Sequence, residues 1–167
     1  MRGSLARAET ITRDHRMVVA LDPQLPPVCV DSPSITEVIY ILVDNASKYS
    51  APGTTVTVRA SQIDEQHVEL RVTDEGPGIP ADLRERVFEK FFRIPGRDPS
   101  DSRRGGVGLG LPIARRLVEA QAGRIWIEPP TSSGRGTVAM TLPVARDAAG
   151  VSNGQSDRAA AGVMAMK

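Results

Sequence analysis

The sequence has a single cysteine and no long hydrophobic run, and each shortage excludes a class of protein. Cys29 is the only cysteine among 167 residues, which excludes an internal disulfide framework and a thiolate metal cluster. The longest apolar run, 38–43, is too short to span a membrane, and no secretory signal is visible. These absences predict a cytoplasmic protein without direct membrane insertion, unless a partner recruits it to a membrane.

The sequence also lacks a charge excess of either sign. Lys and Arg number 21 against 20 Asp and Glu, which argues against a nucleic-acid-binding protein. The length predicts one domain with tails. Residues 1–14 are polar and are expected to form a linker or helix end. We place the folded domain at 15–145 and a disordered tail at 146–167, which is rich in Ala, Gly and Ser.

Within the folded unit, β-rich runs alternate with two helical patterns. Apolar residues at helical spacing predict a helix of about fifteen residues, opened by Ser32 to Ser34 with a capping box at Ser34 and Glu37. A second helix is predicted at 111–122, with Gly123 as its C′ residue. The other expected elements are strands at 17–21, 28–30, 54–60, 67–73, 124–128 and 136–142, a short helix at 81–92, and a lid or binding loop at 93–106.

The end of the first helix carries the first chemical motif, Asp44 to Tyr49. Helical spacing puts Ile41, Asn45 and Lys48 on one stripe. An Asn carbonyl oxygen is a hard ligand suited to Mg²⁺, and a lysine one turn further can meet phosphate oxygens. Taken alone, the motif fits an Asn–Lys pair on a solvated helix face better.

A glycine-containing loop, Asp74 to Pro80, follows the expected strand at 67–73. A carboxylate at a strand end can accept a hydrogen bond from the exocyclic amine of adenine and would disfavour the carbonyl of guanine. Gly76 and Gly78 would let the backbone approach a ligand closely. An ordinary Gly–Pro turn explains the same residues equally well.

A second glycine-rich segment, Gly105 to Pro112, runs into the second helix. Glycines at a helix N-terminus expose N–H groups to an anion. No Lys-Ser/Thr pair follows the last glycine and no strand precedes the segment, so it is neither a P-loop nor a dinucleotide fingerprint. The alternative is a flexible hinge before a helix.

All three phenylalanines of the chain lie in a short segment just before the expected loop at 93–106. We interpret Phe88, Phe91 and Phe92 as a hydrophobic anchor that positions this loop. Four arginines lie on or near the loop and either reach phosphates or are solvated. They are Arg93, Arg97, Arg103 and Arg104.

In order and spacing, the four motifs resemble the N, G1, F and G2 boxes of sensor histidine kinases of two-component systems, members of the GHKL ATPase superfamily. The resemblance covers residues 15–143, including the lead-in 25–31 and the closing segment 134–143. It implies a Bergerat-type α/β two-layer sandwich. A mixed sheet of about five strands would be covered on one face by about three helices, with ATP under a mobile lid.

The same resemblance implies roles for individual residues. Asn45 would bind Mg²⁺ and Lys48 would contact phosphate, both as catalytic residues, and Tyr49 would pack near the base or ribose. Asp74 would recognise the adenine amine. The remaining nucleotide contacts that the resemblance implies are Gly76, Gly78, Ile79, Arg93, Gly106, Val107, Gly108, Leu109, Gly110, Leu111 and Thr137.

Two features depart from the family pattern. Ile41 stands where the N box usually has another Asn, which removes a hydrogen-bonding group from the phosphate end of the site. The chain also lacks the helical hairpin with the phosphorylated histidine, and we assign His15 and His67 ordinary structural roles. The resemblance therefore implies an ATP-binding half that phosphorylates a histidine on a separate dimerisation domain or partner protein, upstream of a response regulator.

Two other functions stay open. A stand-alone GHKL serine kinase of the anti-sigma-factor type is similarly small, but it usually has a Glu at the position of Ile41 and no clear F box. A nucleotide-binding interaction subunit without catalysis would also explain Ile41.

Overall fold

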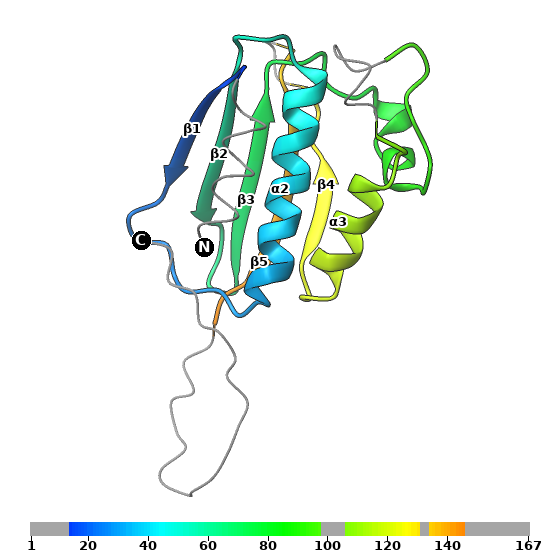
Figure 1. Cartoon of the computed structure of the whole chain (residues 1–167). Helices are drawn as coiled ribbons and strands as arrows, with labels where there is room; N and C mark the ends of the chain where they lie inside the picture. The colour runs from blue at the N-terminus through cyan, green and yellow to red at the C-terminus, as the bar shows by residue number, and fades with distance from the viewer. Residues whose placement is uncertain (1–13, 98–105, 131–133, 146–167) are drawn as a thin grey trace, which may run out of the picture.

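A five-stranded mixed sheet forms the frame of the domain in the computed structural model, which describes residues 14–97, 106–130 and 134–145 (Figure 1). The strand order is β1 (Arg16–Leu21), β2 (Thr55–Gln62), β3 (His67–Asp74), β5 (Gly136–Pro143) and β4 (Arg124–Ile127). Strand β1 runs parallel to β2, and the other neighbours are antiparallel. The predicted tail and nearly all of the predicted N-terminal linker lie outside the described residues.

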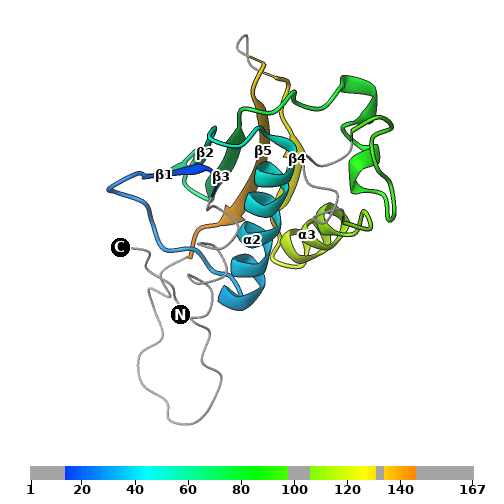
Figure 2. The same ribbon diagram turned by 45° about the horizontal axis from the view of Figure 1, so that its top comes forward.

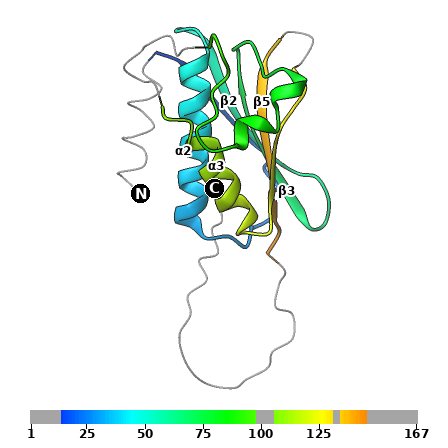
Figure 3. The same cartoon turned by 90° about the vertical axis from the view of Figure 1, so that its right-hand side faces the viewer.

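Helices cover one face of this sheet. Helix α2 (Ser32–Tyr49) and helix α3 (Gly110–Glu119) lie together on the same side, as Figures 2 and 3 show. Two 3₁₀ turns, η1 (Ala81–Leu83) and η2 (Arg86–Phe88), precede α3 in the chain. The two-layer α/β architecture and the five-stranded mixed sheet are therefore confirmed. None of the described helices is long and apolar enough to cross a bilayer.

Side-chain alternation explains which face of the sheet is covered. Val68, Leu70 and Val72 of β3 are buried against the helices, and their register partners on β5 lie on the same face. Between them, Glu69 and Arg71 point to the other face and form an ion pair of 2.5 Å. The alternation of side chains thus separates an apolar face that packs against the helices from an opposite face that carries the Glu69–Arg71 pair.

Helix α2 is longer than the predicted fifteen residues and begins differently. Its N-cap is Asp31, whose carboxylate accepts the N–H of Ser34 at 3.0 Å, so the expected capping box at Ser34 is wrong. The helix ends where the Ser50 N–H donates to the Ala46 carbonyl at 3.2 Å and its hydroxyl donates there at 2.6 Å. This end brings Asn45, Lys48 and Tyr49 to one edge of the domain.

Helix α3 is shorter than predicted, and Gly123 has a different role. The residue with left-handed backbone after the helix is Ala122, with φ 55°, so the C′ assignment to Gly123 is wrong. A Cβ on Gly123 would lie 2.2 Å from the carbonyl oxygen of Thr141 and 2.9 Å from Val118 Cγ1. Gly123 is therefore required by the close packing of the helix end on β5.

Two further expectations differ from the structure. The predicted strand 28–30 is a single bridge between Val28 and Val144, because Asp31 already caps α2 directly after it. The predicted helix at 81–92 is only η1 and η2. Its backbone bonds reach back only three residues, as from Phe88 to Glu85, and the N–H of Phe91 donates to the distant Gly108 carbonyl at 2.9 Å.

The contrast between Ala122 and Gly123 generates a stability prediction. Gly123→Ala is expected to destabilise the fold by about 1–3 kcal/mol through overpacking. Ala122→Gly is expected to stabilise it by about 0.5–1 kcal/mol by relieving the left-handed backbone. Urea unfolding of both variants measures these changes, and equal effects of the two substitutions would contradict the assigned roles.

Candidate functional site

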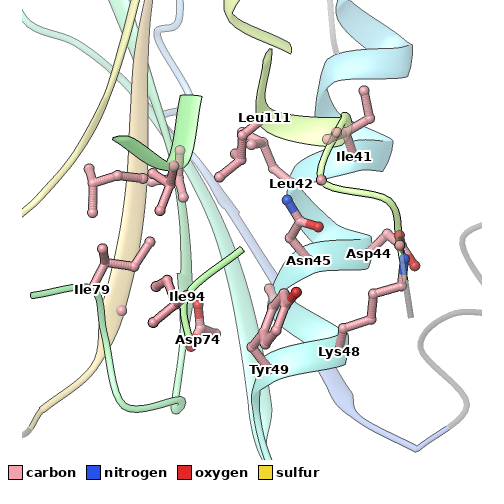
Figure 4. A pocket seen from close by; sticks show the side chains of 18 of the residues that line it. Ile41, Leu42, Asp44, Asn45, Lys48, Tyr49, Asp74, Ile79, Ile94 and Leu111 are labelled. Atoms are coloured by element: carbon pink, nitrogen blue, oxygen red, sulfur yellow. Dashed lines mark hydrogen bonds and ion pairs between the residues drawn. The ribbon is translucent and has the colours of Figure 1, made fainter. Parts of the chain in front are cut away.

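A cavity of about 300 Å³ opens between α2, the end of β3 and the start of α3, at the lower end of the range for small-molecule sites. Figure 4 shows Asp44, Asn45 and Lys48 on the α2 side and Asp74, Ile79 and Ile94 across from them. The four sequence motifs, which are separate along the chain, meet here.

The structure brings the predicted site residues together with one exception. Gly76 does not line the cavity but lies directly behind Asp74. The predicted residues that line it are Asn45, Lys48, Tyr49, Asp74, Gly78, Ile79, Arg93, Gly106, Val107, Gly108, Leu109, Gly110, Leu111 and Thr137.

Asp74 is enclosed by backbone at the end of β3. Its Oδ1 accepts the N–H of Gly76 at 2.7 Å. A Cβ on Gly76 would lie 2.6 Å from Asp74 Oδ1 and 2.7 Å from the carbonyl oxygen of Tyr49, and one on Gly136 would lie 3.1 Å from Asp74 Oδ2. Burial raises the pKa of Asp74, and the Gly76 hydrogen bond opposes part of this shift.

The walls beside Asp74 are mainly apolar. Ile79 and Ile94 line the cavity and also pack against the hydrophobic core. Thr137 is buried, with its hydroxyl 3.0 Å from that of Thr73. Tyr49 is 41% exposed at the mouth. One partly buried acceptor between apolar walls suits a flat heteroaromatic ring that carries a hydrogen-bond donor.

The opposite end of the cavity is formed by the glycine-rich segment and the start of α3. Leu109 is the N-cap of α3 and provides no side-chain hydrogen bond to the helix, so the first N–H groups need another partner. Gly108 has φ 76°, and a Cβ there would lie 2.8 Å from the carbonyl oxygen of Phe92. This end favours an anion through the helix dipole and N–H groups.

Lys48 lies between this segment and an acidic neighbour. Its Nζ is 2.5 Å from Asp44 Oδ2 and 3.9 Å from the point where a Cβ on Gly106 would stand. Our sequence reasoning missed Asp44, although its spacing of four residues from Lys48 is the signal for such a pair. Asp44 therefore holds Lys48 at the anion-favouring end.

Ile41 is a packing residue in the same corner. It is only 9% exposed, and its Cγ2 is 3.2 Å from the point where a Cβ on Gly110 would stand. The Asn45 amide lies 3.7–3.8 Å from that point. Among the described residues, no group of three or more His, Cys, Asp or Glu could hold a metal.

The four arginines predicted on or near the loop differ in where they lie. Arg93 lines the cavity, whereas Arg103 and Arg104 lie outside the described residues. Arg97 also lines the cavity and is half-buried, and its guanidinium donates to the carbonyl of Gly78. No signal in the sequence identifies this bond.

Neither histidine lines the cavity. A ring nitrogen of His15 lies 3.0 Å from the Ser47 carbonyl and the other lies 3.3 Å from the Thr54 hydroxyl. His67 pairs with Asp64 at 3.0 Å. Both make the structural contacts that we expected.

Comparison with known proteins agrees with this geometry. Residues 30–146 match the model of the family described as histidine kinase-, DNA gyrase B- and HSP90-like ATPase. The chain belongs to this family. Within it, the relatives identify a GHKL catalytic domain of the sensor histidine kinase kind.

Two curated relatives are sensor kinases much longer than this chain. The adaptive-response sensory kinase SasA of Nostoc sp. (strain PCC 7120) is 34% identical over 117 residues, which cover 70% of this chain and 28% of SasA. The sensor protein KdpD of Clostridium acetobutylicum is 37% identical over 122 residues, which cover 73% of this chain and 13% of KdpD.

Solved structures show the same fold. The mycobacterial sensor histidine kinase MprB has 35% identity and a TM-score of 0.73, covering 86% of this chain and 92% of that one. Full-length ShkA in complex with AMPPNP has 26% identity and a TM-score of 0.67, covering 85% of this chain and 30% of that one.

The buried carboxyl of the kinase domain generates a pH prediction. Burial raises the pKa of Asp74 in the folded state. The free energy of unfolding therefore has its full value below the unfolded-state pKa, and it falls as pH rises through the higher folded-state pKa. Asp74→Asn should therefore be more stable than wild type near about pH 7, with the difference shrinking toward about pH 4. Urea unfolding across this range measures it, and parallel curves would contradict the assignment.

Proposed function

We propose that this domain binds Mg-ATP and transfers the γ-phosphoryl group to a histidine on a separate domain or partner protein in two-component signalling. One observation carries the proposal: a single cavity has the enclosed Asp74 carboxyl near one end and the uncapped start of α3 with Lys48 at the other. These ends match the base and the phosphates of one nucleotide. The complex of the related ShkA with AMPPNP supports it.

The base end favours adenine over guanine. The Asp74 carboxylate accepts hydrogen bonds, and adenine presents an exocyclic amine where guanine presents a carbonyl oxygen. A guanine would therefore put two acceptors against each other in a buried place. The backbone at Gly76 and Gly136 lies close to the carboxyl and narrows the space around it. Ile79 and Tyr49 offer surfaces for the ring.

The phosphate end combines several donors. Lys48 and the N–H groups of the glycine-rich segment would hold the phosphates. The Asn45 amide oxygen would contribute a ligand to Mg²⁺ bound with them. When bound, Mg²⁺ neutralises negative charge on the phosphoryl oxygens. The chain's own residues bind and orient the nucleotide, and such positioning is the main protein contribution in phosphoryl transfer.

The acceptor histidine would come from outside the described part of the chain, because neither His15 nor His67 lines the cavity. An imidazole nitrogen of that histidine would form the N–P bond as the bond from the γ-phosphorus to ADP breaks. A response regulator would then receive the phosphoryl group. Since the reaction uses ATP, we place the domain in the cytoplasm, alone or recruited to a membrane by its partner.

Transfer of labelled phosphate tests this function. The domain is incubated with γ-labelled Mg-ATP, alone and with the histidine-bearing domain encoded beside it or in its parent chain. Acid-labile label on the acceptor, and none on this domain alone, is the expected result, and Asp74→Asn should abolish it. Acid-stable label on a partner would indicate a serine kinase. Binding without any transfer would indicate a nucleotide-binding interaction subunit.

A binding prediction addresses Asn45. Removing a charge-assisted contact costs about 1.5–3 kcal/mol, so Asn45→Ala should weaken Mg-ATP affinity roughly 10- to 100-fold. The loss should be smaller for nucleotide in the presence of a chelator, because Asn45 acts through the metal. Calorimetric titration measures both affinities. Gln62→Ala, on the far part of β2, serves as control, and unchanged Mg-ATP affinity in Asn45→Ala would refute the role.

A further inference from the structure

The segment after the phenylalanine cluster makes a tight turn at the mouth of the cavity. The N–H of Arg97 donates to the Ile94 carbonyl at 3.2 Å, with Pro95 and Gly96 between them. Gly96 has φ 72°. Proline in the second position and a left-handed glycine in the third are the requirements of a type II turn. The sequence Ile-Pro-Gly-Arg therefore reverses the chain direction here through a type II turn.

The turn directs Arg97 onto the loop that follows β3. Its guanidinium donates to the carbonyl of Gly78. The next carbonyl of that loop, of Ile79, accepts Nε of Arg84 at 3.2 Å. Two arginines thus hold successive carbonyls of one loop. They differ in position, because Arg97 lines the cavity and Arg84 does not.

Arg97 stands between two hollows. Besides the main cavity, a smaller one of about 270 Å³ lies outside it, lined also by Ser50, Ala51 and Gly96. Arg97 lines both hollows together with Lys48, Tyr49 and Pro77. On the inner side, Ile94 lines the main cavity and packs against the core. The turn is thus anchored inside by Ile94 and outside by Arg97.

We propose that Arg97 is a positioning residue that straps the base end of the nucleotide cavity. With its bond to Gly78, it closes the side where the cavity meets the outer hollow. A nucleotide that leaves by this side must wait until the bond between Arg97 and Gly78 breaks. The strap therefore sets how long the nucleotide stays bound. This inference rests on the proposed binding of adenine nucleotide at Asp74.

Nucleotide dissociation kinetics test the strap. Wild-type domain is loaded with N-methylanthraniloyl-ADP in Mg²⁺ buffer, and fluorescence is followed after mixing with excess ADP. Loss of a charged hydrogen bond predicts that Arg97→Ala releases the probe about five- to tenfold faster. The association rate should not fall, because the strap does not attract the ligand. Arg97→Lys, which keeps a cationic donor, should recover part of the effect.

Arg84→Ala is the matched control, because Arg84 holds the adjacent carbonyl without lining the cavity. Its dissociation rate should stay close to wild type. A rate raised equally in both variants would show that loop rigidity, not the strap, controls release, and would overturn the proposal. An unchanged rate in Arg97→Ala would overturn it as well.

A second pair of variants tests the turn. Gly96→Ala strains the left-handed position without meeting any atom within 4 Å, and Gly53→Ala does the same in the connection from α2 to β2. Only Gly96→Ala should speed release, whereas both should lower stability similarly in urea. Equal release rates would contradict the strap. Failure of wild-type protein to bind the probe would instead overturn the proposed function, and the strap with it.

Discussion

The contact between the start of α3 and the middle of α2 is the constraint on which the site depends. At Gly110 the two helices come so close that a Cβ would meet Ile41 at 3.2 Å and the Asn45 amide at 3.7 Å. This approach places the uncapped first turn of α3 beside the side chains at the end of α2. Without it, the glycine-rich segment would not face Asn45 and Lys48. Ile41 is thus part of the packing that assembles the site.

The phenylalanine segment holds this arrangement from the outside. Phe88 is buried, with the Arg115 guanidinium of α3 3.9 Å from its ring centre. Phe91 donates its N–H to the Gly108 carbonyl at 2.9 Å and has left-handed backbone with φ 65°. The segment is therefore tied to α3 and to the glycine-rich segment together. The same anchoring places Ile94 and Arg97 at the mouth of the cavity.

The two ends of the cavity differ in charge: one end has a carboxyl group and the other has a lysine. Asp74 is a partly buried acceptor, and burial raises its pKa. At the other end, Lys48 forms an ion pair with Asp44 at 2.5 Å. A polyanion that binds there must compete with Asp44 for Lys48 or share Lys48 with it. A single cavity can therefore distinguish the two ends of one ligand, because burial acts on one group and pairing on the other.

The sequence by itself determined the order of the five strands of the sheet and of α2 and α3, and half of the residues that line the cavity. Period-two alternation in β3 and helical spacing in α2 are local properties, and they specify which faces are buried wherever the elements pack. It misplaced the caps of α2 and α3, where neighbouring residues compete for the same local role, as Asp31 and Ser34 do at the start of α2. It also predicted a helix at 81–92, where the structure has two 3₁₀ turns and Phe91 bonds the distant Gly108. Tertiary structure alone decided that Gly123 faces the Thr141 carbonyl and that Arg97 bonds Gly78. Both contacts join residues far apart in the chain, and no local pattern records which backbone will lie opposite.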